Sequence, residues 1–308
     1  IAIFGHGLVG STLIDQVLSS AKNIEIKKGI KLNIFAIANS TKLVINEAGI
    51  KENWKTEIAT NGEAYSVQDI IKYAKENHLE NLIAVDNTAS SSFVENYVTL
   101  IESGFDVVSS NKIANTLSYG FYKEIRQVLQ DNQKNYLYET NVGAGLPLID
   151  TIKLLHLSGE NITKIKGVFS GTLSYIFNHF SVEDKLFSEV LKEAIALGFT
   201  EPDPREDLCG NDVPRKLLIL ARELDLQNEF NEIEIQNLIP IELRSLTTSN
   251  FLENLQLLDN HYKTIKENQE KGNVLRYIGE LSGDLQQDKG NLEVKLVSDP
   301  LNSVLGQL

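Results

Sequence analysis

A charged turn before an apolar helix is the first place where this sequence could do chemistry. Residues 197–220 read LGFTEPDPREDLCGNDVPRKLLIL, and Asp212 and Lys216 fall four residues apart at the start of the helix. That spacing puts both side chains on one helical face. A lysine beside a carboxylate can give or take a proton during a reaction. The residues alone favour the simpler alternative of a surface ion pair, worth roughly a few tenths of a kcal/mol.

A second chemical motif lies at the start of the chain. The stretch IAIFGHGLVG places Gly5, Gly7 and Gly10 in G-x-G-x-x-G spacing, after a short apolar run and before an amphipathic pattern. In a strand-turn-helix unit such glycines let the backbone approach a pyrophosphate, which the helix N-terminus then binds. We therefore predict that this turn, including Leu8 and Val9, binds a dinucleotide. A tight turn without a ligand is the alternative.

The residues that follow the next predicted strand, 31–39, favour one dinucleotide over the other. Asn39, Ser40 and Lys42 lie there, and no carboxylate does. An acid at this position would accept hydrogen bonds from the adenosine ribose and repel a 2′-phosphate. We therefore expect NADP(H) to be preferred over NAD(H), while a turn that is merely polar remains an alternative.

Polar residues also follow two later predicted strands. Thr88 comes after the strand at 81–87, and Ser110 and Lys112 end or follow the strand at 105–110. Ligands of open α/β sheets bind at the carboxyl ends of the strands. We predict that Thr88, Ser110 and Lys112 contact the cofactor, although Asn-Lys pairs such as that at Lys112 are also common on surfaces.

The elements that position these residues alternate along the first half of the chain. Strands are predicted at the N-terminus and at 31–39, 81–87, 105–110 and 135–139, and helices at 66–78, 91–103 and 118–131. This order predicts an α/β domain with a Rossmann-like doubly wound parallel sheet. The second half changes to helices around strands at 162–170, 273–281 and 291–297, which predicts an α+β domain.

Composition limits the class of protein. The chain has 308 residues, a net charge of −13 and 42% hydrophobic residues spread over short runs. These values predict no membrane span and no nucleic-acid partner, since phosphate binding needs a basic stripe. The single cysteine, Cys209, permits no intrachain disulfide and fits a reducing cytoplasm. We expect a cytoplasmic protein with a small-molecule partner.

Several motifs together resemble homoserine dehydrogenase, especially the dehydrogenase half of bifunctional aspartokinase–homoserine dehydrogenases. They are GHGLVG, AIANS, SSNKIANT, ETNVGAGLP, FSGTLSYIF and GFTEPDPREDLCGNDVPRKL, in family order and over nearly the whole chain. The resemblance implies an oxidoreductase that uses NADP(H) to reduce L-aspartate 4-semialdehyde to L-homoserine, in threonine and methionine biosynthesis.

The resemblance also implies roles for individual residues. Glu201 and Asp212 would bind the ammonium group of the amino-acid substrate, and Lys216 would donate a proton to the aldehyde oxygen. Lys112 matches a family lysine near the nicotinamide and the substrate, and Gly198 matches a cofactor contact. With Lys216, the residues Asp212 and Lys112 complete the predicted catalytic set.

The segment ETNVGAGLP carries one further implication. By resemblance, Na⁺ or K⁺ would be held by Glu139 and by the main-chain oxygens of Val142, Ala144 and Leu146. Hard oxygen ligands suit such an ion. A glycine-rich hinge without a metal is the alternative.

The resemblance finally implies an organisation for the whole protein. Residues 1–141 would form the NADP-binding Rossmann domain, and residues 142–308 the substrate-binding, catalytic and dimerisation domain. The family's C-terminal segment that returns to the nucleotide domain does not occur before Leu308. We expect a homodimer or higher homo-oligomer and fusion to an aspartokinase domain. A dehydrogenase acting on another amino acid, and a non-catalytic dinucleotide-sensing module, are the alternatives.

Overall fold

The structure is a computed structural model that describes residues 1–308 and contains two compact units, Ile1–Leu146 and Pro147–Leu308. The predicted division at residue 141 falls just before this boundary, within the ETNVGAGLP segment. Each unit has its own sheet.

The first unit is built on a six-stranded sheet in the order β3-β2-β1-β4-β5-β6. Its strands are β1 (Ala2–Phe4), β2 (Ala36–Ala38), β3 (Leu43–Ile45), β4 (Ile83–Asp86), β5 (Asp106–Ser109) and β6 (Tyr136–Leu137). Its helices are α1 (Leu8–Lys28), α2 (Trp54–Asn61), α3 (Val67–Glu76), α4 (Ser91–Val94), α5 (Tyr97–Glu102) and α6 (Tyr119–Asn132), with a 3₁₀ turn, η1 (Glu139–Asn141). All neighbouring strands are parallel except β2 and β3, which are antiparallel.

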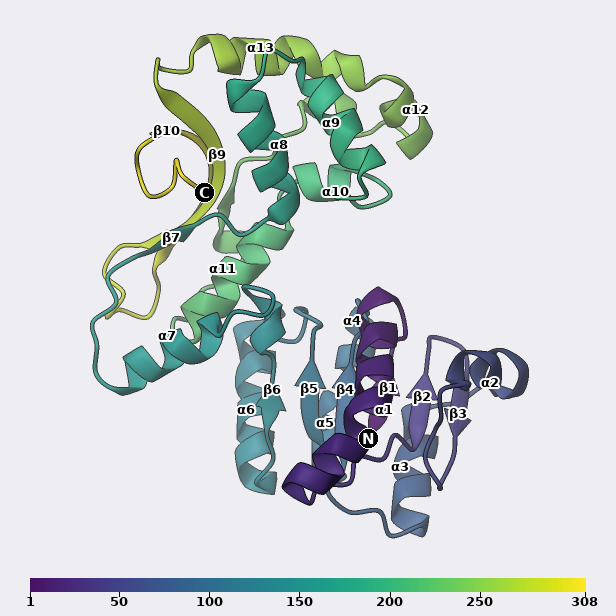
Figure 1. The fold of residues 1–308 in the computed structure, drawn as a ribbon. Helices are drawn as coiled ribbons and strands as arrows, with labels where there is room; N and C mark the ends of the chain where they lie inside the picture. The colour runs from purple at the N-terminus through teal and green to yellow at the C-terminus, as the bar shows by residue number, and fades with distance from the viewer. The chain divides into compact units, whose positions relative to one another are not determined.

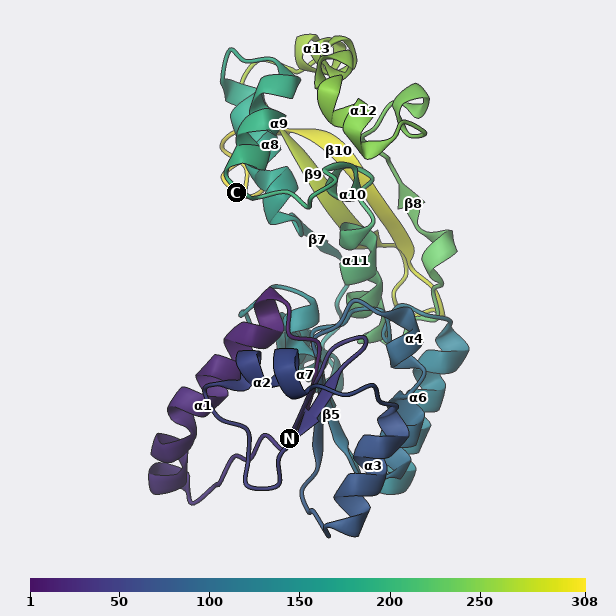
Figure 2. The same ribbon diagram turned by 90° about the vertical axis from the view of Figure 1, so that its right-hand side faces the viewer.

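Helices cover both faces of this sheet, as Figure 2 shows with α1 on one side and α3 and α6 on the other. Because side chains alternate along a strand, β1 sends Ile3 into the cluster with α1 and α2, and Phe4 into the cluster with α3 and α5. A strand buried on both faces must be apolar throughout, which explains the IAIF run. The predicted doubly wound fold is confirmed.

The second unit has a four-stranded mixed sheet in the order β7-β9-β10-β8. Its strands are β7 (Ile165–Gly167), β8 (Glu234–Ile235), β9 (Asn273–Ser282) and β10 (Asn291–Pro300). Its helices are α7 (Leu148–Leu157), α8 (Gly171–Val182), α9 (Phe187–Ala196), α10 (Arg205–Leu208), α11 (Asp212–Arg222), α12 (Thr248–Glu253) and α13 (Asp259–Glu267), and its 3₁₀ turns are η2 (Phe230–Glu232), η3 (Ile241–Leu243) and η4 (Leu255–Leu258). Helices α8 and α11 pack on the long strand β9 (Figure 1), so the predicted α+β character is confirmed.

Some details of the first unit differ from the expectation. The predicted helix at 91–103 is interrupted between α4 and α5, where the side chain of Asn96 donates to the carbonyl of Phe93 at 3.0 Å. Such local side-chain bonds compete with the helical ladder. The sheet is also not wholly parallel, because β3 folds back along β2 as an antiparallel edge strand. Three residues are too short a pattern to have predicted it.

Candidate active site

The glycine turn between β1 and α1 is held close to the sheet. Gly5 has φ +82° and donates its N–H to the carbonyl of Ala38 at 2.8 Å. A Cβ on Gly10 would lie 2.0 Å from the carbonyl oxygen of Gly5, so only glycine fits there. A Cβ on Gly7, by contrast, would meet nothing within 4 Å. Packing within the protein therefore requires glycine at positions 5 and 10. It does not require glycine at position 7, where the space beside the turn is open.

The first turn of α1 is open to a ligand. Gly7 is the N-cap and offers no side-chain hydrogen bond to the helix. Leu8 and Val9, which follow it, are 88% and 57% exposed. The first N–H groups of a helix have no partner within the helix, and together with its dipole they attract anions. This turn suits the pyrophosphate of a dinucleotide.

The turn after β2 is organised by Asn39. Its Oδ1 atom accepts the backbone N–H groups of Thr41 at 2.9 Å and Lys42 at 2.7 Å, while Ser40 is exposed. The ammonium of Lys42 donates to the carbonyl of Ala59, in α2, at 2.7 Å. Lys42 is therefore near the end of β2 but already hydrogen-bonded, and a contact with a 2′-phosphate would replace that bond.

The ends of β4 and β5 meet as predicted. The Ser110 hydroxyl donates to Oδ1 of Asn87 at 3.1 Å, and Thr88 is the next residue along. A Cβ on Gly5 would lie 2.9 Å from the Asn87 backbone, so the glycine turn and this edge are adjacent. The Nδ2 atom of Asn87 is buried and has no hydrogen-bond partner in the protein. Because such a donor is costly to leave unpaired, the edge fits a ligand that supplies an acceptor.

Asp86, the last residue of β4, accepts hydrogen bonds from residues of this edge. It was not among the residues predicted from the sequence. It is 1% exposed, and burial raises the pKa of its carboxyl above the usual value although hydrogen bonds from Tyr97, Thr88 and Asn111 oppose this. These come from the backbone N–H of Thr88 at 2.7 Å, the hydroxyl of Tyr97 at 2.7 Å and the amide of Asn111 at 3.0 Å. An acid at the end of an otherwise apolar strand is the signal that could have identified it.

Lys112 lies in the short segment between β5 and α6, two residues after Ser110. Its carbonyl accepts the hydroxyl of Thr116 at 3.1 Å, and the side chain is partly exposed. The position is the predicted one, at the carboxyl edge of the first sheet.

In the second unit, Lys216 and Asp212 form a short ion pair on α11. Their Nζ and Oδ2 atoms are 2.6 Å apart, and the side chains are 18% and 48% exposed. The Lys216 ammonium also donates to the carbonyl of Phe169 at 2.6 Å, just before α8. A partly buried lysine held by two oxygens from different elements is more confined than the solvated surface pair considered from the sequence.

Glu201 lies on the loop that follows α9, and Asp207 lies on the short helix α10 that precedes α11. Glu201 is exposed and donates its backbone N–H to Oδ2 of Asp207 at 2.8 Å. Burial raises the pKa of the Asp207 carboxyl, which the Glu201 amide and the Thr172 hydroxyl partly oppose. Asp207 was not predicted from the sequence. In the stretch REDL, nothing distinguishes the half-buried carboxyl of Asp207 from the exposed carboxyl of Glu206.

Gly198 follows the end of α9, in the second unit. Its φ of +71° is the left-handed conformation common after a helix. A helix terminus therefore explains this glycine without a cofactor, and the predicted cofactor contact stays a prediction.

The four predicted cation ligands lie at the end of the first unit. Glu139 begins η1, Val142 follows that turn, and Ala144 and Leu146 are exposed. Ala144 has φ +54°, and Leu146 donates its N–H to the carbonyl of Gly143 at 3.0 Å. The backbone turns sharply here and Glu139 is the only acid of ETNVGAGLP, but the cation site stays a prediction.

Comparison with known proteins decides the family. Residues 147–308 match the model of homoserine dehydrogenase, and residues 5–139 match that of its NAD binding domain. The chain belongs to the homoserine dehydrogenase family. Its first unit is accordingly a nicotinamide-dinucleotide-binding domain of that family.

Individual proteins similar to this chain support the same family assignment. The chain is 40% identical over 306 residues to a bifunctional aspartokinase/homoserine dehydrogenase of Buchnera aphidicola, covering 98% of this chain and 37% of that protein. It is 34% identical to the homoserine dehydrogenase of Schizosaccharomyces pombe, covering 91% of this chain and 77% of the relative. A hyperthermophilic archaeal homoserine dehydrogenase in complex with NADPH has the same fold, with a TM-score of 0.70 at 24% identity over 99% of this chain and 83% of that one. None of the helices here combines the length and apolar character that a membrane span needs.

Proposed function

We propose that this chain catalyses the NADPH-dependent reduction of L-aspartate 4-semialdehyde to L-homoserine. The observation that carries the proposal is the Lys216 ammonium, held at 2.6 Å by both Asp212 and the Phe169 carbonyl in a chain of this family. An ammonium has three N–H donors, and these contacts use two. We assign the third to the oxygen of the substrate aldehyde.

The roles of the other residues follow from charge and position. Glu201, Asp207 and Asp212 give the loop before α11 a negative character that suits the ammonium group of an amino-acid substrate. Asp212 also orients Lys216. Lys112, at the edge of the first sheet, is assigned to the substrate or the nicotinamide.

The cofactor supplies the hydride when it is bound, and the first unit supplies its binding groups. We assign the pyrophosphate to the first turn of α1, at Gly7, Leu8 and Val9, beside the turn formed by Gly5 and Gly10. Asn39, Ser40 and Lys42 are assigned to the adenosine ribose and its 2′-phosphate, and Thr88 and Ser110 to the nicotinamide half. The absence of an acid after β2 supports NADPH over NADH.

A monovalent cation, Na⁺ or K⁺, is part of the proposal. Glu139 and the carbonyls of Val142, Ala144 and Leu146 would hold it, and the sharp turn at Ala144 supports this. Glu139→Gln should then lower activity in Na⁺ or K⁺ buffer. Full activity after both ions are replaced by a bulky organic cation would leave only a hinge.

The organisation of the whole protein is also proposed. Because the chain spans 37% of the bifunctional Buchnera relative, we infer that an aspartokinase part belongs to the same polypeptide. A homodimer or higher homo-oligomer is inferred from the earlier resemblance, and light scattering of the purified protein tests it. A cytoplasmic location stays a prediction.

Steady-state kinetics test the reaction. NADPH oxidation should depend on L-aspartate 4-semialdehyde, and homoserine should be the product. Turnover with a different amino-acid aldehyde only would indicate a related dehydrogenase. NADPH binding without turnover of any such substrate would indicate a dinucleotide-sensing module.

A further inference from the structure

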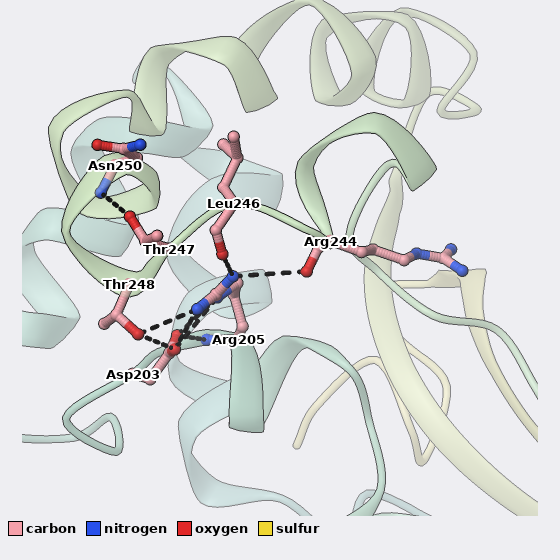
Figure 3. A network of polar contacts seen from close by, with 7 residues as sticks. All are labelled: Asp203, Arg205, Arg244, Leu246, Thr247, Thr248 and Asn250. Atoms are coloured by element: carbon pink, nitrogen blue, oxygen red, sulfur yellow. Dashed lines mark hydrogen bonds and ion pairs between the residues drawn. The ribbon is translucent and has the colours of Figure 1, made fainter.

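Asp203 and Arg205 lie in the middle of residues 199–212, here called the acidic loop, which contains the short helix α10 and ends at the first residue of α11. This loop also carries Glu201, Asp207 and Asp212. Figure 3 shows the Arg205 guanidinium directed at Asp203 and at the segment around Leu246 that leads into α12. Neither residue has a role in the proposed reaction, so their contacts call for a separate explanation.

The Arg205 guanidinium joins two distant parts of the second unit. Its Nε atom donates to Oδ1 of Asp203 at 2.9 Å, and its Nη1 atom donates to the Leu246 carbonyl at 2.5 Å. Its Nη2 atom donates to the Thr248 hydroxyl at 3.1 Å. That hydroxyl donates in turn to Oδ2 of Asp203 at 2.8 Å, which closes a ring of contacts.

These contacts are stronger than those of an exposed ion pair. The Arg205 and Asp203 side chains are only 16% and 20% exposed. The guanidinium carbon lies 5.2 Å from the centre of the Phe251 ring, on α12. Partial burial and a forked geometry strengthen an arginine–carboxylate pair. The Arg205 hydrogen bonds hold the pKa of Asp203 well below its usual range, so the pair stays charged at neutral pH.

The acidic loop is also held by the backbone hydrogen bonds of α10 and by the Thr172 hydroxyl, which donates to the Phe199 carbonyl at 2.6 Å. Pro202 and Pro204 flank Asp203 and supply no backbone N–H for hydrogen bonds. Its acids repel one another, because Asp212 further raises the pKa of Asp207 after burial. Asp203 also accepts the backbone N–H of Arg205 at 3.0 Å, at the start of α10. The Asp203–Arg205 pair adds a link from this negatively charged segment to α12.

We propose that Asp203 and Arg205 are positioning residues that fasten the acidic loop to the start of α12 and so fix the geometry of the substrate-binding carboxylates. This inference rests on the proposed function for its kinetic consequence, but its structural part can be tested separately. The pair does not touch the reacting atoms. It acts through the placement of Glu201 and Asp207, whose backbone-to-carboxylate bond lies on the same loop.

Kinetics of Arg205→Lys and Asp203→Asn test the consequence. Lysine keeps the charge but cannot form the fork. In both variants, KM for the amino-acid substrate should rise on the order of tenfold, equivalent to about 1.4 kcal/mol, while KM for NADPH stays within about twofold. Lys263→Gln breaks an exposed pair with Glu267 on α13 and is the matched control, with unchanged constants expected. Equal changes in both KM values would overturn the positioning role.

Hydrogen exchange tests the structural part without any substrate. The amides of Leu208 and Cys209, which bond to Pro204 and Arg205 within α10, should exchange about tenfold faster in either variant. The amides of β9 should keep the wild-type rate. Unchanged exchange at α10, or a uniform increase across the unit, would show that Asp203 and Arg205 do not fasten the acidic loop to α12. If the wild-type chain reduces no semialdehyde, the proposed function fails, and hydrogen exchange alone still decides whether the two residues fasten the loop.

Discussion

Among single residues, Lys216 is the one whose position matters most to the proposed reaction. Its ammonium is held by two oxygens that come from different elements. Asp212 is one turn earlier on α11, and the Phe169 carbonyl precedes α8. Their common distance of 2.6 Å leaves the ammonium little freedom, which is what proton transfer to a positioned substrate requires. The sequence spacing predicted the first contact, but only the fold brings in the second.

Removing the Lys216 ammonium should therefore affect chemistry more than cofactor binding. We expect Lys216→Met to lower kcat by about 10²–10⁴-fold, as loss of a general acid typically does, with NADPH affinity nearly unchanged. Lys263→Met, on the exposed face of α13, is the matched control and should retain full activity. A near-normal kcat for Lys216→Met would exclude the lysine as proton donor.

Cofactor preference is also decided by single residues. With no acid after β2, we expect kcat/KM to be higher with NADPH than with NADH. Lys42→Ala should narrow the difference if the lysine exchanges its bond to the Ala59 carbonyl for the 2′-phosphate. Measuring both constants for both proteins decides the point, and a clear preference for NADH would refute it.

At the scale of elements, the glycine turn separates folding from binding. Gly10→Ala puts a Cβ 2.0 Å from the Gly5 carbonyl and should destabilise the first unit by about 1–3 kcal/mol. Gly7→Ala meets no protein atom within 4 Å, so its melting temperature should stay near that of the wild type. Its added methyl group would face the pyrophosphate instead, and NADPH affinity should fall on the order of tenfold. Normal affinity in folded Gly7→Ala would argue against a dinucleotide at this turn.

The second sheet contains an ion cluster with a testable pH dependence. The Glu280 carboxylate on β9 lies 2.6 Å from Lys164 and 3.7 Å from Lys166, and its side chain is 15% exposed. The hydrogen bond from Lys164 lowers the pKa of Glu280 below its usual 4.5. A lowered folded-state pKa stabilises the fold above the unfolded-state value, and the contribution is lost as the pH falls through the folded-state value.

Glu280→Gln should therefore lower the free energy of unfolding by roughly 1 kcal/mol at neutral pH. The difference from the wild type should shrink as the pH falls below about 4.5, where the carboxylate of the unfolded chain binds a proton, and it should be lost once the pH passes the lower folded-state pKa. Urea unfolding of the second unit at several pH values measures this. Glu267→Gln, at a more exposed pair, is the control. A difference that does not depend on pH would show that the charge of Glu280 is not responsible.

The sequence predicted long or repeated patterns well and short ones poorly. The strands β1, β4 and β5 and their polar ends followed from apolar runs between turn signals. The edge strand β3 was missed because three residues carry no periodicity. Asp86 and Asp207 were missed for a related reason: their hydrogen-bond partners Tyr97, Asn111 and Thr172 lie 11 or more residues away in the chain. Contacts between distant residues are invisible to local patterns.

At the scale of the whole molecule, the proposed reaction needs groups from both units. The glycine turn and Lys112 belong to Ile1–Leu146. Lys216 and the acidic loop belong to Pro147–Leu308. Each unit has its own sheet, so one unit can be correctly folded while the proposed reaction still requires residues of the other. An assay of either half alone, such as NADPH binding, therefore cannot establish the reaction.

Transfer of deuterium from the cofactor to the substrate is the most direct test of the proposed reaction. The wild-type chain would be incubated with NADPH deuterated at C4 of the nicotinamide and with L-aspartate 4-semialdehyde, and the product examined by mass spectrometry and NMR. We predict L-homoserine with one deuterium on C4, delivered without exchange with water. Cofactor binding with no homoserine formed, or homoserine in which the hydrogen newly added to C4 comes from solvent, would contradict the proposed reaction.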